Sequence, residues 1–285
     1  MEIVHSVLRM QALSKRYRAE GSTIAFVPTM GFLHEGHLSL VRQAKKMAEM
    51  TVVSIFVNPT QFGPAEDFED YPRDLIHDLD MLKEARTDIV FNPEPGDIYP
   101  KDFETKVTVT KSSSILCGAA RPGHFDGVAT IVSKLFNIIS PNYAIFGRKD
   151  YQQAFIIKRM VRDLNFPVEI FLSPTVRESD GLAMSSRNSY LNADERNIAP
   201  LIYRSLKEGE KMLQENWSDL QAVRERIMVV IGGESDIHVE YLELLDAETL
   251  APPKDETEEI LIAVAAKLGR TRLIDNITVK KMEKE

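Results

Sequence analysis

The sequence has little cysteine, no excess of positive charge and no long apolar run. Cys117 is the single cysteine among 285 residues, so no disulfide can form within the chain and a reducing compartment fits. The formal net charge is −8, which argues against a nucleic-acid partner bound through a basic surface. No stretch approaches the roughly 20 apolar residues of a membrane-spanning helix, so we expect no membrane partner.

Several common signals are also missing. Residues 1–11 lack the basic region and apolar core of a secretory signal, so we expect a cytoplasmic protein. The glycine spacing G-x-G-x-x-G of dinucleotide-binding folds is absent, and so is the phosphate-binding loop G-x-x-x-x-G-K-[ST]. These absences argue against a nicotinamide or flavin cofactor and against ordinary phosphate-loop hydrolysis.

What is present is a strand, a glycine turn and two histidines between Phe26 and Leu40. His34 and His37 lie three residues apart where a helix is expected to begin. A helix N-terminus has unpaired N–H groups and the positive end of the helix dipole, and both favour a phosphate. The spacing therefore predicts a phosphate site. Two ring nitrogens on one helix face also leave a metal site and a purely structural pair open.

Apolar runs alternate with helical spacing through the first part of the chain. Strands are predicted at 23–27 (ended by Pro28), 51–57, 88–91, 106–110, 143–146 and 168–172. Helices are predicted at 40–48, 71–85, 128–139 and 157–164. This alternation predicts an α/β, Rossmann-like parallel sheet with helices on both faces.

After Pro174 the pattern changes. Helices are predicted near 194–214 and 219–231, and strands at 239–245, 259–266 and 271–277. The order indicates a smaller α+β C-terminal domain. We therefore expect a nucleotide- and substrate-binding domain at residues 1–174 and a lid domain at residues 175–285.

Ligands of parallel sheets bind beyond the carboxyl ends of the strands. Three polar segments follow predicted strands: 30–37, 58–61 and 147–150. Lys149 in the last of them suits a phosphate, although a surface lysine is the alternative. The sequence predicts that these segments meet at one crevice.

Other polar residues allow more than one interpretation. The loop from Met184 to Asn188 offers two hydroxyls and a guanidinium to a triphosphate, or a helix cap and a surface arginine. Arg121 and His124 form an ordinary turn or reach a phosphate. The aspartates of the 71–85 helix are expected on its solvated face, with a magnesium contact through Asp78 as the alternative.

In combination, these segments resemble the pantothenate synthetase family. The matching stretches are 27–40, 53–63, 71–73, 121–127, 135–137, 146–153 and 177–191. His34-Glu-Gly-His37 alone is shared with many nucleotidyltransferases. Together with Asn58-Pro-Thr-Gln-Phe-Gly63 and Met184-Ser-Ser-Arg-Asn188 it is highly specific. At Arg148 the chain departs from the family, where an uncharged or acidic residue is more common.

The resemblance implies an ATP-dependent ligase that joins pantoate to β-alanine through a pantoyl adenylate and releases pyrophosphate and AMP. It implies Mg²⁺ with ATP, names no metal ligand, and implies a homodimer. The implied catalytic residues are His34, His37 and Lys149, with His37 as proton donor. The implied ATP contacts are Met30, Gly31, His34, Gly36, His37, Gly147, Arg148, Lys149, Asp150, Val176, Met184, Ser185, Ser186 and Arg187. The implied pantoate contacts are Gln61 and Gln153, with Gln61 also near the β-alanine site, and the neutral amide of Asn58 is expected to bind substrate in the same crevice.

Two other functions stay open. One is a nucleotidyltransferase that keeps the adenylyl group on its product. The other is a nucleotide-binding regulatory protein without catalysis.

Overall fold

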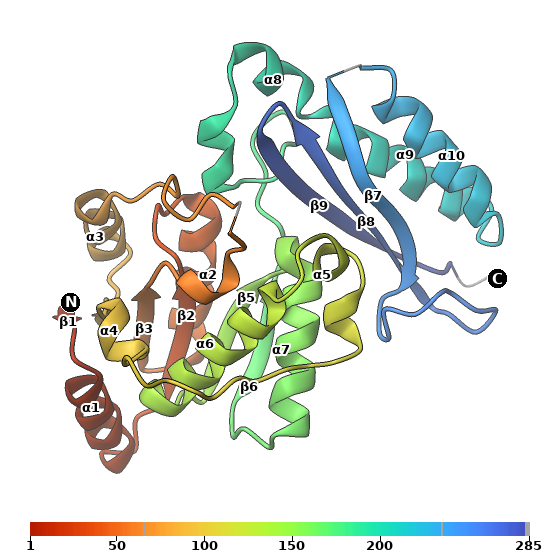
Figure 1. The fold of residues 1–285 in the computed structure, drawn as a ribbon. Coiled ribbons are helices and arrows are strands. Elements are labelled where there is room, and N and C mark those ends of the chain that lie inside the picture. The colour runs from red at the N-terminus through yellow and green to blue at the C-terminus, as the bar shows by residue number, and fades with distance from the viewer. Residues whose placement is uncertain (65, 235, 283–285) are drawn as a thin grey trace. The chain divides into compact units, whose positions relative to one another are not determined.

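The computed structural model of the chain describes residues 1–64, 66–234 and 236–282 (Figure 1). It divides between Thr175 and Val176 into two units, each with its own sheet. Among the described residues, none of the helices has both the length and the apolar character needed to cross a bilayer.

In the first unit, six described strands form one parallel sheet in the order β1-β4-β3-β2-β5-β6. The strands are β1 (Glu2–Val4), β2 (Ile24–Thr29), β3 (Met50–Ile55), β4 (Ile89–Phe91), β5 (Tyr143–Gly147) and β6 (Glu169–Ser173). The predicted α/β class with a parallel sheet is confirmed. The chain leaves β2 toward one edge and later returns to β5 on the other side, so the strand order reverses between β2 and β5.

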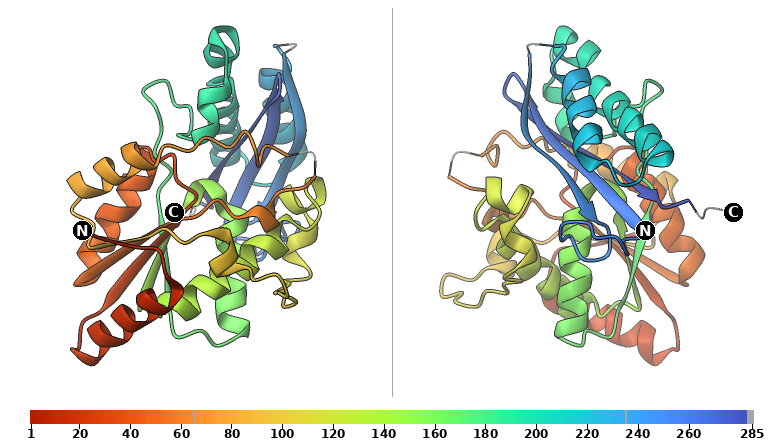
Figure 2. Two further views of the ribbon diagram at one scale, coloured as in Figure 1. Left: turned by 60° about the vertical axis from the view of Figure 1, so that its left-hand side comes forward. Right: turned by 90° about the vertical axis from the view of Figure 1, so that its right-hand side faces the viewer.

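Helices cover both faces of this sheet (Figure 2). The helices of this unit are α1 (Val7–Ala19), α2 (Glu35–Met47), α3 (Leu75–Glu84), α4 (Pro95–Ile98), α5 (Cys117–Ala120), α6 (His124–Ile139) and α7 (Tyr151–Asp163). Ala25 and Val27 of β2 pack in one buried cluster with Val41 and Ala44 of α2. Phe26 points to the opposite face, because successive strand residues alternate, and its ring meets Phe136 of α6.

Pro28 does not end the strand, so that part of the prediction was wrong. β2 continues to Thr29 and pairs with β3 along its whole length. On its other side it pairs with β5 only at Ala25 and Phe26. Pro28 therefore lies where one side of the strand has no ladder to interrupt, and proline is tolerated at such positions.

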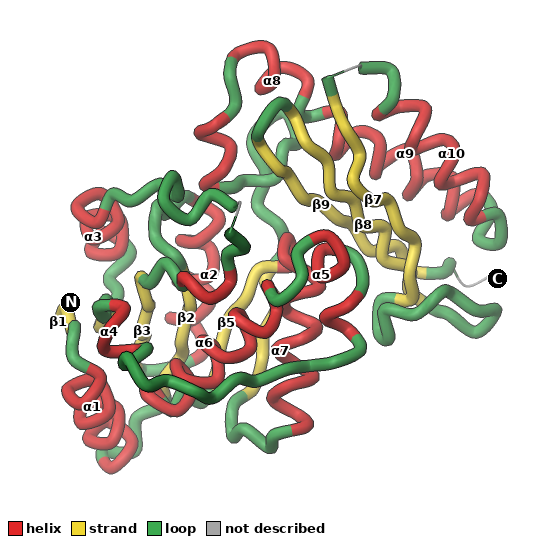
Figure 3. Tube along the Cα trace, in the orientation of Figure 1, coloured by secondary structure: helices red, strands yellow, loops and turns green. Residues whose placement is uncertain are grey.

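The predicted strand at 106–110 is also wrong. This segment runs as loop between α4 and α5 (Figure 3). It lies along α6 instead of a sheet edge, since Val107 N–H donates to Thr130 Oγ1 and Lys106 pairs with Asp126. Alternating apolar residues indicated a strand, but tertiary contacts supplied other partners for the backbone.

Two N-terminal elements, β1 and α1, were not predicted. The first turn of α1 is capped by Ser6, whose hydroxyl accepts the Arg9 N–H. The buried residues of α1 are Met10, Leu13 and Ser14. So narrow an apolar stripe gives weak periodicity, and the serine cap was the available signal.

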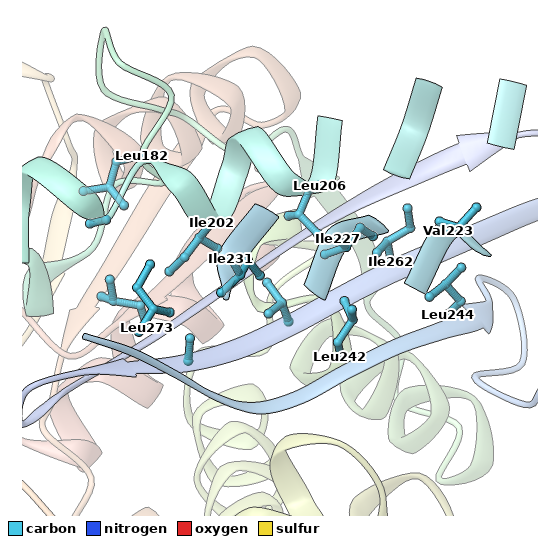
Figure 4. Packing of buried hydrophobic residues seen from close by; sticks show 14 of the residues in the cluster. Leu182, Ile202, Leu206, Val223, Ile227, Ile231, Leu242, Leu244, Ile262 and Leu273 are labelled. Atoms are coloured by element: carbon cyan, nitrogen blue, oxygen red, sulfur yellow. The ribbon is translucent and has the colours of Figure 1, made fainter. Parts of the chain in front are cut away.

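The second unit packs helices on one antiparallel sheet, β7-β8-β9. Its elements are α8 (Ala193–Ile198), α9 (Leu201–Glu215), α10 (Leu220–Ile231), β7 (Ile237–Asp246), β8 (Glu259–Leu268) and β9 (Thr271–Lys280). Figure 4 shows its core, where Ile202 and Leu206 of α9 and Ile227 of α10 meet Ile262 of β8. The predicted smaller α+β unit is confirmed.

We expect Ile227→Ala to destabilise the second unit by about 2–5 kcal/mol, because Ile227 is 0% exposed and its removal leaves a cavity. The matched control is Val229→Ala on the same helix, where the side chain is 66% exposed and the change should be within about 0.5 kcal/mol. Denaturation followed by fluorescence of Trp217, the single tryptophan, measures this, because Trp217 packs on the same core. Equal midpoints for the two variants would contradict the assigned core.

Candidate functional site

The candidate site of the first unit lies at the carboxyl ends of β3, β2 and β5. These strands are parallel neighbours, so their carboxyl ends lie at the same edge of the sheet. The segments that follow them carry Asn58 and Gln61, then Met30 to His37, and then Gly147 to Asp150. The reversal of strand order between β2 and β5 is the position where open α/β sheets bind ligands.

His34 and His37 cap the start of α2 reciprocally. His34 is the N-cap residue, and its Nδ1 accepts the Gly36 N–H at 3.1 Å. His37 Nδ1 accepts the His34 N–H at 3.3 Å. The two ring centroids lie 4.1 Å apart. The predicted helix start at this pair is confirmed, and histidine here takes the part that serine and glutamate play in the usual capping box.

This capping determines where the imidazole protons lie. A backbone N–H can only donate, so each Nδ1 must be an unprotonated acceptor. In a neutral ring the proton is then on Nε2. Burial lowers the pKa of His37 well below its usual value, and the electrostatic effects of the neighbouring His34 and Lys149 lower it further. His37 is therefore a neutral imidazole at neutral pH and carries its proton on Nε2, where it is available for donation to a ligand.

The turn between β2 and α2 has a strained backbone. Gly31 has a φ of +82° and Phe32 a φ of +50°. A side chain on Gly31 would place its Cβ 2.9 Å from Oδ2 of Asp78, so the position needs glycine for space as well as for conformation. A bulky residue at positive φ costs about 1–3 kcal/mol and persists where its surroundings hold it.

Asp78 holds this turn, and its expected place on the solvated face of a helix was wrong. The side chain is 1% exposed. Oδ2 accepts the Phe32 N–H at 2.8 Å, and Oδ1 accepts the Leu33 N–H at 2.6 Å. Burial raises the pKa of Asp78, although these two bonds oppose the shift. The helical spacing of Leu75, Leu79 and Leu82 predicts that these leucines form one apolar stripe of the 71–85 helix. Leu75 is 40% exposed, however, and the buried residues of α3 are Asp78 and Leu82.

The segment after β3 forms a short 3₁₀ helix, η1 (Pro59–Gln61). Asn58 is 1% exposed and Gln61 is 8% exposed. Asn58 Nδ2 donates to Oε1 of Gln61 at 3.1 Å. Gln61 Nε2 lies 2.9 Å from Sδ of Met30, which connects this segment to the turn after β2. The structure thus brings Asn58, Gln61 and Met30 together.

The backbone of Gln61 is clamped by Arg121 and His124. Its carbonyl oxygen accepts from His124 Nδ1 at 2.7 Å and from Arg121 Nη2 at 3.2 Å. Arg121 also makes a bidentate pair with Glu66, at 2.7 and 2.5 Å. Burial opposes ionisation of Glu66, but the arginine outweighs it and lowers the pKa of the carboxyl. The structure shows the turn, since the His124 N–H donates to the Arg121 carbonyl at 3.1 Å, and it shows in addition that both side chains brace the loop after β3. The phosphate contact stays a prediction.

The segment after β5 forms η3 (Arg148–Asp150) and leads into α7. The Lys149 side chain is 19% exposed, and its Nζ lies 3.9 Å from Oδ1 of Asp150. Lys149 is close enough to His37 to affect the pKa of that ring. Arg148 is exposed, while Gln153 in the first turn of α7 is half-buried. A side chain on Gly147 would meet open space, so its backbone is accessible.

The remaining predicted residues lie in the second unit. Val176 O accepts the Met184 N–H at 3.0 Å, which closes a loop. Ser185 caps η4 (Ser186–Tyr190), and its hydroxyl accepts the Arg187 N–H. Capping was the alternative to phosphate binding for this serine cluster, and Ser185 at least does cap.

Arg177 anchors this loop and was not among the predicted site residues. It pairs with both oxygens of Asp275 at 2.6 and 2.9 Å. Its guanidinium lies 3.7 Å from the centroid of the Tyr203 ring. Bidentate pairing and stacking together orient the start of the loop that carries Met184 to Arg187.

Known proteins resemble this chain over nearly its full length. The family model of pantoate-beta-alanine ligase matches residues 2–278. A pantothenate synthetase of Thermosipho melanesiensis is 49% identical over 279 residues, covering 98% of this chain and 99% of the relative. The crystal structure of a pantothenate synthetase from Thermus thermophilus superposes with a TM-score of 0.94 at 43% identity, covering 99% of this chain and 100% of that one.

A third relative is described with ligands. The pantoate-beta-alanine ligase of Francisella tularensis was crystallised in complex with beta-gamma ATP and beta-alanine. It is 35% identical, covers 97% of each chain and has a TM-score of 0.81. These similarities extend across both units of the chain.

We expect Asp78→Asn to loosen the turn after β2, because an amide nitrogen would face one backbone N–H and leave it unpaired. A buried unsatisfied donor costs about 1–3 kcal/mol. Hydrogen exchange of the Phe32 and Leu33 amides should be faster, and the free energy of unfolding lower. Asp80→Asn is the control, since Asp80 is exposed on the same helix. Unchanged amide protection in Asp78→Asn would show that the carboxylate does not hold the turn.

Proposed function

The chain belongs to the pantoate–β-alanine ligase family, and on this premise we propose that it condenses pantoate with β-alanine at the expense of ATP. The products are pantothenate, AMP and pyrophosphate, and the intermediate is pantoyl adenylate. The observation that carries the proposal is the pair of capping imidazoles at the start of α2, of which His37 is neutral and within electrostatic reach of Lys149. The family match over residues 2–278 supports the choice of substrates.

We propose that the turn after β2 and the segment after β5 bind ATP together with the serine–arginine loop. The residues are Met30, Gly31, His34, Gly36, His37, Gly147, Arg148, Lys149, Asp150, Val176, Met184, Ser185, Ser186 and Arg187. Gln61 and Gln153 are proposed to contact pantoate, with Gln61 also near β-alanine. In this proposal the first unit binds nucleotide and pantoate, and the second acts as the lid.

The chemistry needs no nucleophile from the protein. A carboxylate oxygen of pantoate attacks the α-phosphorus, a new O–P bond forms, and the bond to the β-phosphate oxygen breaks as pyrophosphate leaves. The amine of β-alanine then attacks the acyl carbon, AMP leaves, and the amine loses a proton. Neither step therefore requires Cys117 as a nucleophile.

Negative charge grows on the phosphoryl oxygens in the first step. The Nε2–H groups of His34 and His37 and the ammonium of Lys149 are donors suited to that charge. Because the capping bonds already hold both rings, little reorganisation is needed when the charge develops. Donors that bind the transition state more tightly than the substrate raise the rate.

We propose that Mg²⁺ enters with ATP. Magnesium in such sites is usually held by substrate phosphates, waters and one or two carboxylates. Within the described part of the chain, no three His, Cys, Asp or Glu side chains are grouped as a metal site. Both oxygens of Asp78 already accept backbone N–H bonds. The proposal therefore assigns the ion to the phosphates and names no protein ligand.

A homodimer and a cytoplasmic location are also proposed. The family resemblance supports the dimer. The single cysteine, which suits a reducing compartment, supports the location.

Incubation with ATP, pantoate and β-alanine should give AMP, pyrophosphate and pantothenate in equal amounts, measured by chromatography. Without β-alanine the reaction should stop after about one turnover per site, because the adenylate stays bound. A nucleotidyltransferase would instead turn over without releasing AMP. A regulatory protein would bind ATP and release no pyrophosphate.

His37→Asn and His37→Gln should separate the two nitrogens of the ring. Asparagine keeps an acceptor near the Nδ1 position for the His34 N–H but has no donor at Nε2. We expect AMP formation to fall about 10²–10³-fold, as for loss of one transition-state donor, with α2 intact. Glutamine reaches the Nε2 position, so His37→Gln should retain more activity. The reverse order would mean that capping, and not donation, is what His37 supplies.

A further inference from the structure

Tyr99 lies just after α4 and was not singled out as a site residue by its sequence. Its hydroxyl donates to Oδ1 of Asn58 at 2.8 Å. Thr60 Oγ1 donates to the same oxygen at 2.9 Å. Burial raises the pKa of Tyr99, although a hydrogen bond with the Thr60 side chain opposes this shift. The phenol therefore keeps its proton and remains a donor.

The Asn58 side chain has no hydrogen-bonding capacity left for a substrate. Its oxygen accepts two hydroxyls, and its nitrogen donates to Gln61 Oε1 and to the Gly127 carbonyl, both at 3.1 Å. A carboxamide offers two acceptor sites and two N–H donors, and all four are used. Hydroxyls on one side and a backbone carbonyl on the other also determine which atom is oxygen and which is nitrogen.

This orientation is passed to Gln61. Because Asn58 presents an N–H, Gln61 must turn Oε1 toward it. Nε2 of Gln61 then faces away, toward Sδ of Met30, which is a weak acceptor. Gln61 therefore offers N–H donors, and not its carbonyl oxygen, to a ligand at the strand ends.

The backbone around Gln61 leaves little other freedom. A side chain on Gly127 would place its Cβ 2.3 Å from the Thr60 carbonyl oxygen, so η1 and α6 are in direct backbone contact there. His124 and Arg121 hold the Gln61 carbonyl. With the main chain held, rotation of the terminal amide is the main way in which Gln61 can change what it presents.

We propose that Tyr99 is a positioning residue that acts through Asn58 to keep the donor side of the Gln61 amide toward pantoate. Asn58 is then also a positioning residue, in place of the substrate contact expected from its place in the sequence. A carboxylate or hydroxyl oxygen of pantoate is the acceptor that this arrangement recognises. The inference rests on the proposed function, in which Gln61 contacts pantoate.

The test is steady-state kinetics of Tyr99→Phe and Thr60→Val, alone and in a Gln61→Met background. Loss of one neutral hydrogen bond corresponds to about a 2- to 12-fold effect. We expect each single variant to raise KM for pantoate by that factor and to leave KM for ATP within about twofold. In the Gln61→Met background neither change should add more than about twofold, since no amide remains to orient.

The hydrogen bonds from Tyr99 through Asn58 to Gln61 form the proposed relay. Tyr17→Phe is the control, because Tyr17 lies on α1 and outside this relay. Thr60 is exposed, so Thr60→Val tests the relay even if Tyr99→Phe does not fold. Equal effects on the two KM values, or full additivity with Gln61→Met, would overturn the relay. An inactive wild-type enzyme would overturn the proposed function instead, and the two failures are therefore distinguishable.

Discussion

The arrangement of the strand ends depends on one buried carboxylate. Asp78 accepts two consecutive backbone N–H groups, those of Phe32 and Leu33, in a turn where Gly31 and Phe32 both have positive φ. Hydrogen bonds to a charged group contribute about 1.5–3 kcal/mol each, which is enough to offset the strain at Phe32. With the turn held, His34 lies at the N-cap of α2 and the reciprocal bonds with His37 can form.

A second consequence is electrostatic. The same bonds that start α2 place a lone pair on each Nδ1, and burial together with the proximity of His34 and Lys149 lowers the pKa of His37. The hydrogen bonds that cap α2 therefore also determine which ring nitrogen of each histidine can carry a proton. An imidazole pair without these bonds would be free to choose its tautomer and to take up a proton as the pH falls toward its ordinary value.

The polar segment after β3 is also held by hydrogen bonds from residues that are distant in the sequence. Asn58 hydrogen-bonds to Tyr99 and Gln61, while Arg121 and His124 hold the Gln61 carbonyl, and such pairing is how buried polar groups avoid the cost of desolvation. Such a network rigidifies the short η1 segment and leaves the Gln61 amide nitrogen facing the Met30 side chain. The site therefore depends on the residues that hold the Gln61 amide in place as well as on Gln61 itself.

The sequence alone determined the features that depend on residues close to one another along the chain. Apolar periodicity predicted most strands, the strand–helix alternation predicted the parallel sheet, and the spacing of His34 and His37 predicted the start of α2, because these are local properties. Tertiary structure decided which partners distant residues would meet. Asp78 accepts from Phe32, 46 residues away, and Tyr99 donates to Asn58, 41 residues away. The 106–110 segment lies along α6 and not in a sheet. A carboxylate on a helix looks the same in sequence whether it faces water or a strained turn, since only packing determines which donors surround it.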